Sequence, residues 1–453
     1  MKVVLVSHSS AVDNLGGAEL TLLHLIDEWR RLRNDVEFFV IARTPTGLLQ
    51  GELDQRSVSH ESIDFDSWVL PLVREVPFQV LWTARMDSQA VARMAELIDE
   101  FAGDIVVSNT IVSPWGALAA RSLGLPHVWM VHEYGDLDHG LGFRLGRDRT
   151  FEDIGILSDV VVANSEAVRN HVSQWVPSDK LAIAYPPIDL ERARRLARSV
   201  SPEVPTTELR VVMVGRLAPS KGQWRLLRAM ATLRTEGVPI RATIVGGLES
   251  EDARQIVTLA DTLGLSDAVD FVGETDNPFR FIAAADVGVT ASDSEAFGRV
   301  TVEYLALGLP VIATDAGANP ELVEHGVTGW LFDAHAPDGL TDALREAHSD
   351  RDEVLRRGTA ARRRVEEGLA HAYPLEPLIS RVEELKVQGA RAMVRLPNIT
   401  REWLELPLVV ERYLADMHLI RSAAHASMTW RLGRLITVPL RFAARLKRGR
   451  RGA

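Results

Sequence analysis

The chain has 453 residues and no cysteine, which excludes disulfide bonds, thiol catalysis and cysteine-bound metals. Hydrophobic residues make up 46% of it, as in folded proteins, and the 62 acidic residues against 51 basic ones argue against general nucleic-acid binding. No apolar run approaches the roughly 20 residues of a transmembrane helix and no secretory signal is recognisable, so we expect a cytoplasmic protein.

Short apolar runs alternate with helical patterns over residues 1–200. The predicted strands are Val3–Val6, Val36–Ile41, Ile105–Ser108, Val128–Val131, Val160–Ala163 and Leu181–Ala184. Amphipathic helices are predicted between them, for example over Leu20–Leu32 and Arg85–Phe101. Because β-branched runs separated by helices indicate parallel strands buried on both faces, residues 1–200 are predicted to form one doubly wound α/β domain.

The same alternation restarts after Ser199–Glu208, a polar, proline-bearing stretch that is the predicted domain boundary. Further strands are predicted at Arg210–Val214, Ala242–Val245, Val269–Val272, Val287–Thr290 and Val311–Ala313. Residues 201–385 therefore form a second predicted Rossmann-like domain, closed by helices between about residues 339 and 390. Two such domains that face each other across a cleft would bind ligands at the carboxyl ends of their strands.

The last segment, residues 386–453, is predicted to be a helical extension that becomes basic towards its end. Residues 431–453 hold eight arginines and lysines and no acidic residue. Within residues 430–451 the basic residues interleave with leucines and aromatic residues, a pattern typical of a helix that lies on an anionic membrane surface. Packing of this segment on the acidic body of the protein is the alternative interpretation.

Two glutamates follow the strand predicted at Val287–Thr290. Ser294 is expected to cap a helix that carries Glu295 at its start and Glu303 two turns further on. At ~1.5 Å per helical residue the two would be roughly 12 Å apart, which suits the sugar and the ribose of a nucleotide sugar. Each glutamate alone could simply cap the helix or face solvent, but an unpaired carboxylate among the apolar neighbours of Glu303 would be costly to bury.

A diphosphate site is predicted between these glutamates. The amides of Phe297 and Gly298 would face the diphosphate at a helix N-terminus, where the helix dipole favours negative charge. Arg216 and Lys221 follow a buried strand, where two cations could neutralise a departing nucleoside diphosphate. A solvated loop with ordinary charges is the alternative. No cluster has metal-ligand spacing, so neither a metal nor another cofactor is expected.

The first domain contributes two weaker signals. Gly16 and Gly17 precede a predicted helix, and glycines there let a phosphate approach the backbone, although a lone pair of glycines usually marks only a turn. His132 follows a predicted strand, where a solitary histidine is more often structural than functional.

The sequence resembles the retaining GT-B glycosyltransferases of the group 1, or family 4, type over about residues 1–375. The resemblance rests on Glu295-x7-Glu303, on Gly308-Leu-Pro-Val-Ile-Ala-Thr with Glu321-Leu-Val, and on Val214-Gly-Arg-Leu with Lys221-Gly222. The chain departs from the family pattern at Ala296, at Ala318 and over residues 185–189.

The resemblance implies a role for each of these residues. Glu295 and His132 would lie beside the donor sugar and form the catalytic pair, and Glu303 would hold the ribose hydroxyls. The donor diphosphate would be bound by Arg216, Lys221, Phe297, Gly298, Gly16 and Gly17. A sugar would pass from a nucleotide diphosphate sugar to a hydroxyl acceptor, a glycan or a lipid-linked molecule, in the synthesis of a cell-surface polysaccharide or glycolipid.

We therefore predict a retaining glycosyltransferase of hexosyltransferase type that needs no metal and docks peripherally on the inner face of the cell membrane. Two alternatives stay open. A GT-B-fold nucleotide-sugar epimerase would share the diphosphate site without using an acceptor, and a non-catalytic subunit would only bind the nucleotide sugar. Product analysis without acceptor separates the first from the transferase, and a turnover assay separates the second.

Overall fold

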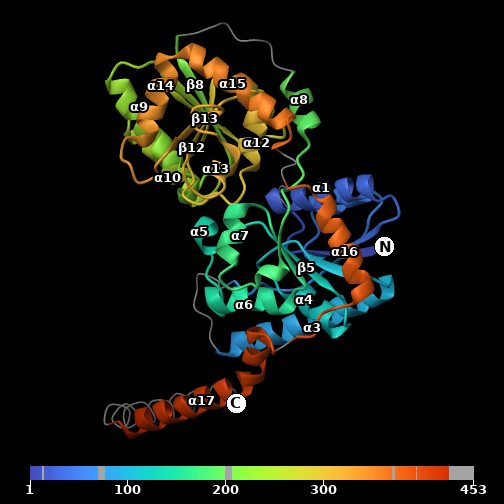
Figure 1. Ribbon diagram of the computed structural model, residues 1–453. Coiled ribbons are helices and arrows are strands. Elements are labelled where there is room, and N and C mark those ends of the chain that lie inside the picture. Colours follow the sequence, from blue (N-terminus) through green and yellow to red (C-terminus); the bar gives the residue numbers. More distant parts are fainter. Residues whose placement is uncertain (13–14, 70–76, 199–206, 370–372, 394, 428–453) are drawn as a thin grey trace, which may run out of the picture.

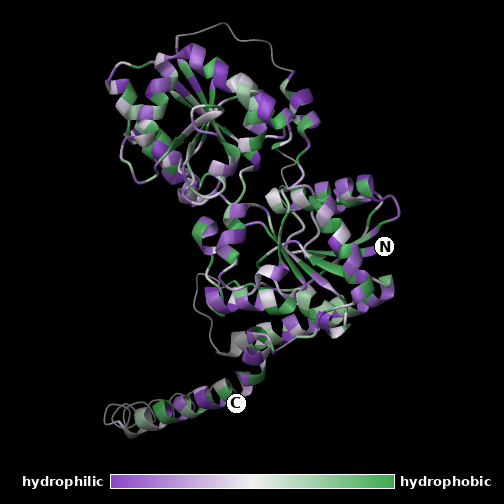
Figure 2. Ribbon diagram, viewed as in Figure 1, coloured by the Kyte–Doolittle hydropathy of each residue, from purple (hydrophilic) through white to green (hydrophobic). Residues whose placement is uncertain are grey.

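The computed structural model describes residues 1–12, 15–69, 77–198, 207–369, 373–393 and 395–427. The residues form two α/β domains with one parallel sheet each, and a helix that projects from the first domain (Figure 1). Most of the predicted linker and all of the predicted membrane-docking segment 430–451 lie outside the described residues. Figure 2 shows the strands to be largely hydrophobic and the outer helices to be mixed, as expected for sheets that are covered on both faces.

The first domain contains a seven-stranded parallel sheet in the order β3-β2-β1-β4-β5-β6-β7. Its strands are β1 (Lys2–Ser7), β2 (Glu37–Arg43), β3 (Ser59–Ile63), β4 (Ile105–Ser108), β5 (His127–Val131), β6 (Val160–Ala163) and β7 (Leu181–Ile183). Its helices are α1 (Gly17–Leu32), α2 (Leu48–Gln55), α3 (Pro77–Phe101), α4 (Trp115–Ser122), α5 (Asp136–His139), α6 (Arg147–Leu157) and α7 (Glu166–Val172). Strand β3 was not predicted, because it is a polar strand at the edge of the sheet.

The second domain contains a six-stranded parallel sheet in the order β10-β9-β8-β11-β12-β13. Its strands are β8 (Leu209–Val214), β9 (Ile240–Val245), β10 (Val269–Gly273), β11 (Val287–Thr290), β12 (Val311–Thr314) and β13 (Gly329–Phe332). Its helices are α9 (Gln223–Thr235), α10 (Glu251–Thr262), α11 (Phe279–Ala283), α12 (Arg299–Ala306), α13 (Asn319–Leu322), α14 (Gly339–Ser349) and α15 (Arg351–Glu366). The edge strand β13 was not predicted.

Both sheets reverse their strand order at one point, next to the first strand of each domain. The reversal lies between β1 and β4 in the first sheet and between β8 and β11 in the second. Loops that leave the carboxyl ends of these strands diverge to opposite sides, which leaves a crevice for ligands. The residues proposed from sequence follow β1, β5, β8 and β11, and so lie at or beside these two points.

The chain passes between the domains earlier than predicted. Helix α8 (Leu190–Ala197) already packs on α11 and α12 of the second domain, and Ala193 is buried in that core. The crossing therefore lies near Tyr185, before α8, instead of within Ser199–Glu208. The sequence pattern could not reveal this, because amphipathic periodicity shows that a helix has a buried face but not which domain covers it.

The helices after residue 339 do not all close the second domain as predicted. Helices α14 and α15 pack there, but α16 (Glu376–Gln388) returns to the first domain and packs along α1 (Figure 1). Its apolar residues Leu378, Ile379 and Val382 are buried in the core beneath α1 and the first sheet.

The last described helix, α17 (Asn398–Ala426), begins against α3 and α6. Ile399 is fully buried there, and the ring of Trp403 stacks on Trp115 with 5.4 Å between centroids. Beyond these turns the helix extends away from the body (Figure 1). No helix in the described part of the chain combines the length and the hydrophobicity needed to cross a bilayer.

Candidate functional site

The loop after β8 is shaped by a glycine that no other residue could replace without strain. Gly222 has φ +77°, and a Cβ atom there would lie 2.1 Å from the carbonyl oxygen of Ala291. The buried side chain of Gln223 donates a hydrogen bond to the carbonyl oxygen of Arg216 at 2.9 Å. This close packing brings Lys221, on the short 3-10 helix Pro219–Lys221, against the loop that follows β11.

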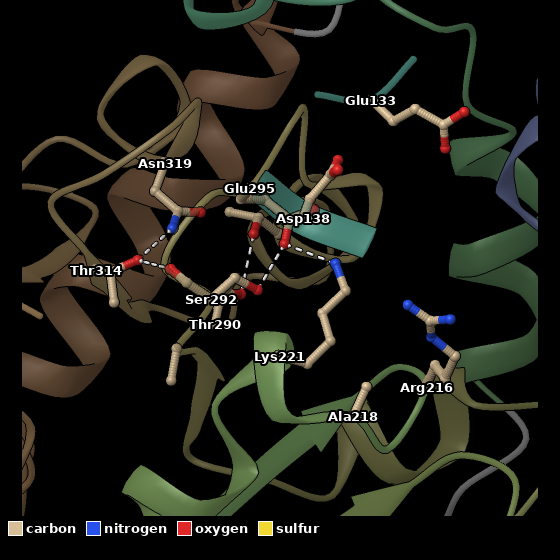
Figure 3. Close-up of polar contacts among 12 residues, drawn as sticks. Glu133, Asp138, Arg216, Ala218, Lys221, Thr290, Ser292, Glu295, Thr314 and Asn319 are labelled. Atoms are coloured by element: carbon tan, nitrogen blue, oxygen red, sulfur yellow. Dashed lines mark hydrogen bonds and ion pairs between the residues drawn. The ribbon is translucent and has the colours of Figure 1, made fainter. Parts of the chain in front are cut away.

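The carboxylate of Glu295 is the acceptor on which this part of the site converges. Lys221 Nζ donates to Glu295 Oε2 at 3.0 Å, and Ser292 Oγ donates to the same oxygen at 2.8 Å (Figure 3). The side chains of Lys221 and Glu295 are 29% and 13% exposed, so the ion pair is only partly screened by water. Behind it, Thr314 donates to the carbonyl oxygen of Ser292, and Asn319 donates to Thr314 at 2.9 Å.

The helix after Glu295 starts later than predicted. Helix α12 begins at Arg299, and its N-cap is Gly298 with φ +93°. Ser294 therefore does not cap it, and Glu295 lies in the preceding loop, so the predicted helical separation from Glu303 does not apply. The N–H groups of Phe297 and Gly298 have no acceptor among the described residues, which leaves them available to an anion.

Glu303 lies on α12 one turn beyond Arg299. Burial raises the pKa of its carboxyl to about 7, although Arg299 and Arg192 act in the opposite direction. Its carboxylate makes no hydrogen bond within the part of the chain that the structure describes. A buried acceptor of this kind can be satisfied by hydroxyl groups of a bound molecule.

The start of α12 is tied to the start of α1 in the other domain. The guanidinium of Arg299 donates to Thr21 Oγ1 at 3.3 Å and to the carbonyl oxygen of Pro187 at 3.2 Å. Gly17 is the first residue of α1 and Gly16 its N-cap, and a Cβ atom on Gly17 would lie 4.0 Å from Arg299 Cδ. The two helix starts therefore meet at the junction of the domains.

His132 follows β5 and is held in one tautomer. Asn109 donates through Nδ2 to the carbonyl oxygen of Ala18 at 2.9 Å, so its Oδ1 accepts from His132 Nε2 at 2.8 Å. Burial lowers the pKa of His132 to about 4, with a further contribution from Arg299. The ring is therefore neutral at pH 7. Its buried Nδ1 has no partner among the described residues and can accept a hydrogen bond.

Two site residues were missed by sequence analysis, Glu133 and His139. His139 Nδ1 lies 3.0 Å from Arg216 Nη2, and its Nε2 lies 3.5 Å from Glu133 Oε2, so the imidazole bridges the domains. Burial raises the pKa of Glu133 to about 7, and the neighbouring carboxylates of Asp138 and Glu19 raise it further. Glu133 could have been selected by the reasoning applied to His132, since both follow β5. His139 is placed by the turn at Gly135, which has φ +88°; a glycine indicates a turn but not which side chains the turn brings together.

A second contact between the domains lies behind the Glu295 loop. Glu321 on α13 accepts hydrogen bonds from the backbone N–H of Ala167 at 2.8 Å and of Glu166 at 3.0 Å, at the start of α7. It also accepts from the hydroxyl of Tyr185 at 2.9 Å, and the Tyr185 ring packs edge to face on Phe297 with 4.9 Å between centroids. The carboxylate thus joins α13 of the second domain to the start of α7 in the first, where the helix dipole favours negative charge.

A cavity of about 230 Å³ opens at the carboxyl ends of β1 and β2 in the first domain. It is lined by His8, Arg43, Phe65, Asp66, Ser67, Val69, Val112, Ser113 and Leu141. The buried atoms His8 Nδ1 and Ser113 Oγ have no partner among the described residues. Polar atoms of this kind within a partly apolar wall suit a molecule with several hydroxyl groups.

The described residues contain no group of three or more histidine, aspartate or glutamate side chains placed to hold a metal ion.

Two family models match the two domains. The model for glycosyltransferase family 4 matches residues 15–192, and the model for glycosyl transferases group 1 matches residues 197–364. Together the matches support a place for the chain among the group 1 glycosyltransferases.

The chain is similar to named bacterial proteins and to solved structures. It is 29% identical over 394 residues to D-inositol 3-phosphate glycosyltransferase of Streptomyces scabiei. This alignment covers 78% of this chain and 83% of the relative. It is 35% identical over 215 residues to the corresponding enzyme of Corynebacterium urealyticum, over 44% of this chain and 50% of the relative. Among solved structures, Anabaena HepE in complex with UDP and glucose aligns with a TM-score of 0.64 at 22% identity, over 85% of this chain and 98% of that one. Sucrose-phosphate synthase of Thermosynechococcus elongatus aligns with a TM-score of 0.64 at 19% identity, over 86% and 98%.

Proposed function

We propose that this chain, a glycosyltransferase of GT-B fold, transfers a sugar from a nucleoside diphosphate sugar to a hydroxyl acceptor with retention of anomeric configuration. The observation that carries the proposal is the convergence on Glu295. Lys221 and Ser292 hold its carboxylate beside the unpaired N–H groups of Phe297 and Gly298, where the second domain meets the first. The names of the relatives support sugar transfer, and the complexes of the similar Anabaena HepE with UDP and with UDP-glucose support a nucleotide-sugar donor.

The donor would lie along the start of α12. Its ribose hydroxyls would donate to Glu303, whose carboxylate makes no hydrogen bond in the described chain. Its diphosphate would be bound by Arg216, Lys221 and the two free N–H groups. Arg216 would leave His139 and bind the diphosphate instead. A guanidinium is attracted more strongly to an anionic phosphate than to a neutral imidazole ring. Gly16 and Gly17 would let the same phosphates approach the start of α1.

The sugar would lie between Glu295 and His132. Neutral His132 can accept a hydrogen bond from a sugar hydroxyl through Nδ1, and Glu295 would accept from another. In the transfer step the bond between the anomeric carbon and the phosphate oxygen breaks, and a bond to the acceptor oxygen forms on the same face. The departing phosphate oxygen takes the acceptor proton, so Glu295 positions the sugar and need not act as a nucleophile. Arg216 and Lys221 stabilise the charge that develops on the diphosphate.

The acceptor would enter from the first domain. The cavity beside His8 lies at the carboxyl edge of the first sheet and offers His8 Nδ1 and Ser113 Oγ to hydroxyl groups. Glu133, with a pKa of about 7, could accept from a hydroxyl when ionised and donate when protonated. We propose a polyhydroxylated acceptor, a glycan or a lipid-linked molecule, as in the synthesis of a surface polysaccharide or glycolipid.

A transfer assay tests this function. Purified protein is incubated with a panel of nucleoside diphosphate sugars and with D-inositol 3-phosphate or a lipid-linked saccharide, and the anomeric configuration of the product is read by NMR. Glu295→Ala and Lys221→Ala should each abolish most of the donor-dependent transfer. Full activity in both variants would contradict the site, and an inverted product would contradict retention. An altered sugar nucleotide formed without acceptor would indicate an epimerase.

The basic segment 430–451 is proposed to hold the enzyme on an anionic membrane. Its alternating basic and apolar residues suit a bilayer surface at ~1 kcal/mol per basic residue. The full chain should cosediment with phosphatidylglycerol-containing liposomes, and a chain ending at residue 427 should not. Equal partitioning of the two proteins would refute the membrane role while leaving the transferase function untouched.

A further inference from the structure

Apolar residues on α17 recur at alternating intervals of four and three positions. They are Ile399, Trp403, Leu406, Val410, Tyr413, Met417 and Ile420, and together they are termed the α17 seam. An average interval of 3.5 residues keeps a seam on one side of a helix that winds around a partner in a left-handed coiled coil.

The structure divides the α17 seam into a covered half and an uncovered half. Ile399 and Leu406 are buried and Trp403 stacks on Trp115, so the first half packs on the body of the protein. The later part of α17 extends outward from the body (Figure 1). There Tyr413, Met417 and Ile420 are 41%, 46% and 63% exposed, with nothing in the described chain packed over them.

We propose that the outer half of the α17 seam pairs with the same segment of a second copy of this chain, as a parallel two-stranded coiled coil. The charges beside the seam favour this partner and this direction. Asp416 and Arg421 flank the seam on opposite sides and are five residues apart. In a parallel pair these are the two positions that face each other across the interface, so two-fold symmetry would form the Asp416–Arg421 ion pair twice.

A second helix suits this surface better than a lipid bilayer does. Between residues 411 and 421 the helix carries Glu411 and Asp416 against Arg412 and Arg421, so it has no excess of positive charge to attract an anionic membrane. Charged residues flank the seam near its end, Asp416 on one side and Arg421 on the other, while Leu414 extends the apolar surface one turn earlier. Helices in proteins gain most of their stability from packing of an apolar face, so pairing would stabilise the projecting half of α17. The pairing does not depend on the sugar-transfer function, although it would bring two basic segments 430–451 together.

Two adjacent exposed residues provide a matched test. Ile420 lies on the α17 seam, whereas Leu419, which is 69% exposed, lies off it. We expect the full-length protein to sediment as a dimer at micromolar concentration in lipid-free buffer, Leu419→Asp to remain a dimer, and Ile420→Asp to sediment as a monomer. Unchanged thermal unfolding of the body in both variants would show that each is folded.

Cross-linking tests the direction of pairing, and the absence of native cysteine makes it specific. In a parallel pair Met417 faces its counterpart, so oxidised Met417→Cys should form a covalent dimer and Leu419→Cys should not. Asp416→Arg should weaken the dimer and Asp416→Arg with Arg421→Asp should restore it. A monomeric wild type, a dimer that survives Ile420→Asp, or equal loss in the Leu419→Asp and Ile420→Asp variants would each overturn the proposal.

Discussion

Replacing Lys221 by methionine isolates what its ammonium group contributes. Methionine keeps most of the side-chain length and removes only the charge and its hydrogen-bond donors. In the structure the ammonium lies 3.0 Å from Glu295 Oε2, and the lysine side chain is 29% exposed. The substitution therefore removes a partly desolvated cation from the place where we expect the donor diphosphate.

The expected loss follows from that environment. A hydrogen bond to a charged group contributes about 1.5–3 kcal/mol, and each ~1.4 kcal/mol corresponds to a tenfold change in an equilibrium or rate constant. Lys221→Met should therefore lower the donor-dependent kcat/KM by about 10- to 150-fold. Part of this loss should appear as a higher KM for the donor, because a diphosphate ligand already binds in the ground state.

Steady-state transfer with varied donor concentration measures the effect, and Arg225→Met is the matched control. Arg225, on α9, also pairs with a carboxylate of the loop after β11, that of Asp293, and donates to the carbonyl oxygen of Ala291 at 3.0 Å. Its loss should lower the melting temperature and leave the donor KM unchanged. An unchanged kcat/KM in Lys221→Met would refute the reasoning. Equal losses in both variants would show that the shape of the loop matters and the ammonium does not.

Three further predictions concern the same region. Because burial raises the pKa of Glu303 from 4.5 to about 7, the folded chain binds this proton more tightly than the unfolded chain and loses stability as pH rises between those values. Glu303→Gln should therefore raise the melting temperature at about pH 8 and hardly change it at about pH 5. The same substitution should abolish the rise in melting temperature that the donor causes. A stabilisation independent of pH would contradict the raised pKa of Glu303. Gly222→Ala should destabilise the protein by more than the ~1–3 kcal/mol of backbone strain alone, because its Cβ would meet Ala291. Gly237→Ala is the control, because Gly237 has φ +80° but a Cβ atom there would meet nothing within 4 Å. If both variants lose the same free energy of unfolding in urea, the clash with Ala291 has no effect. In Glu321→Gln an amide nitrogen would face the N–H donors at the start of α7, so the contact between the domains should weaken. The donor KM should rise, and the radius of gyration measured by X-ray scattering should increase. If neither value changes, Glu321 does not hold the domains together.

Residues that follow predicted strands could be placed from the sequence. Lys221 and Glu295 follow β8 and β11, neighbouring strands whose carboxyl ends share one edge of the sheet, and the structure brings their side chains into contact. The parallel order of the sheets follows from the same runs of β-branched residues. Two doubly wound parallel sheets were therefore predictable from these runs, as was the edge at which the site lies, while the GT-B arrangement was implied by the family resemblance.

Features that depend on loop conformation or on partners distant in sequence could not be placed. The start of α12 was predicted too early, because Ser294 is a good cap in isolation while Gly298, with positive φ, ends the loop instead. His139 reaches Arg216 only through the turn at Gly135. The return of α16 to the first domain depends on which sheet leaves α1 uncovered, and no local pattern records that.

The path of α16 makes the second domain an insertion within the first. The core of the first domain is built from residues before 185 together with Leu378, Ile379 and Val382, so both ends of the intervening sheet are anchored to the same body. A protein cut after α8 would lose the apolar cover of α1, whereas excision of residues between the two crossings would leave both parts of that core on one polypeptide. The two crossings lie side by side, because the backbone N–H of Tyr185 donates to the carbonyl oxygen of Tyr373 at 3.0 Å. Two neighbouring attachments restrict the movement of the second domain more than a single tether would.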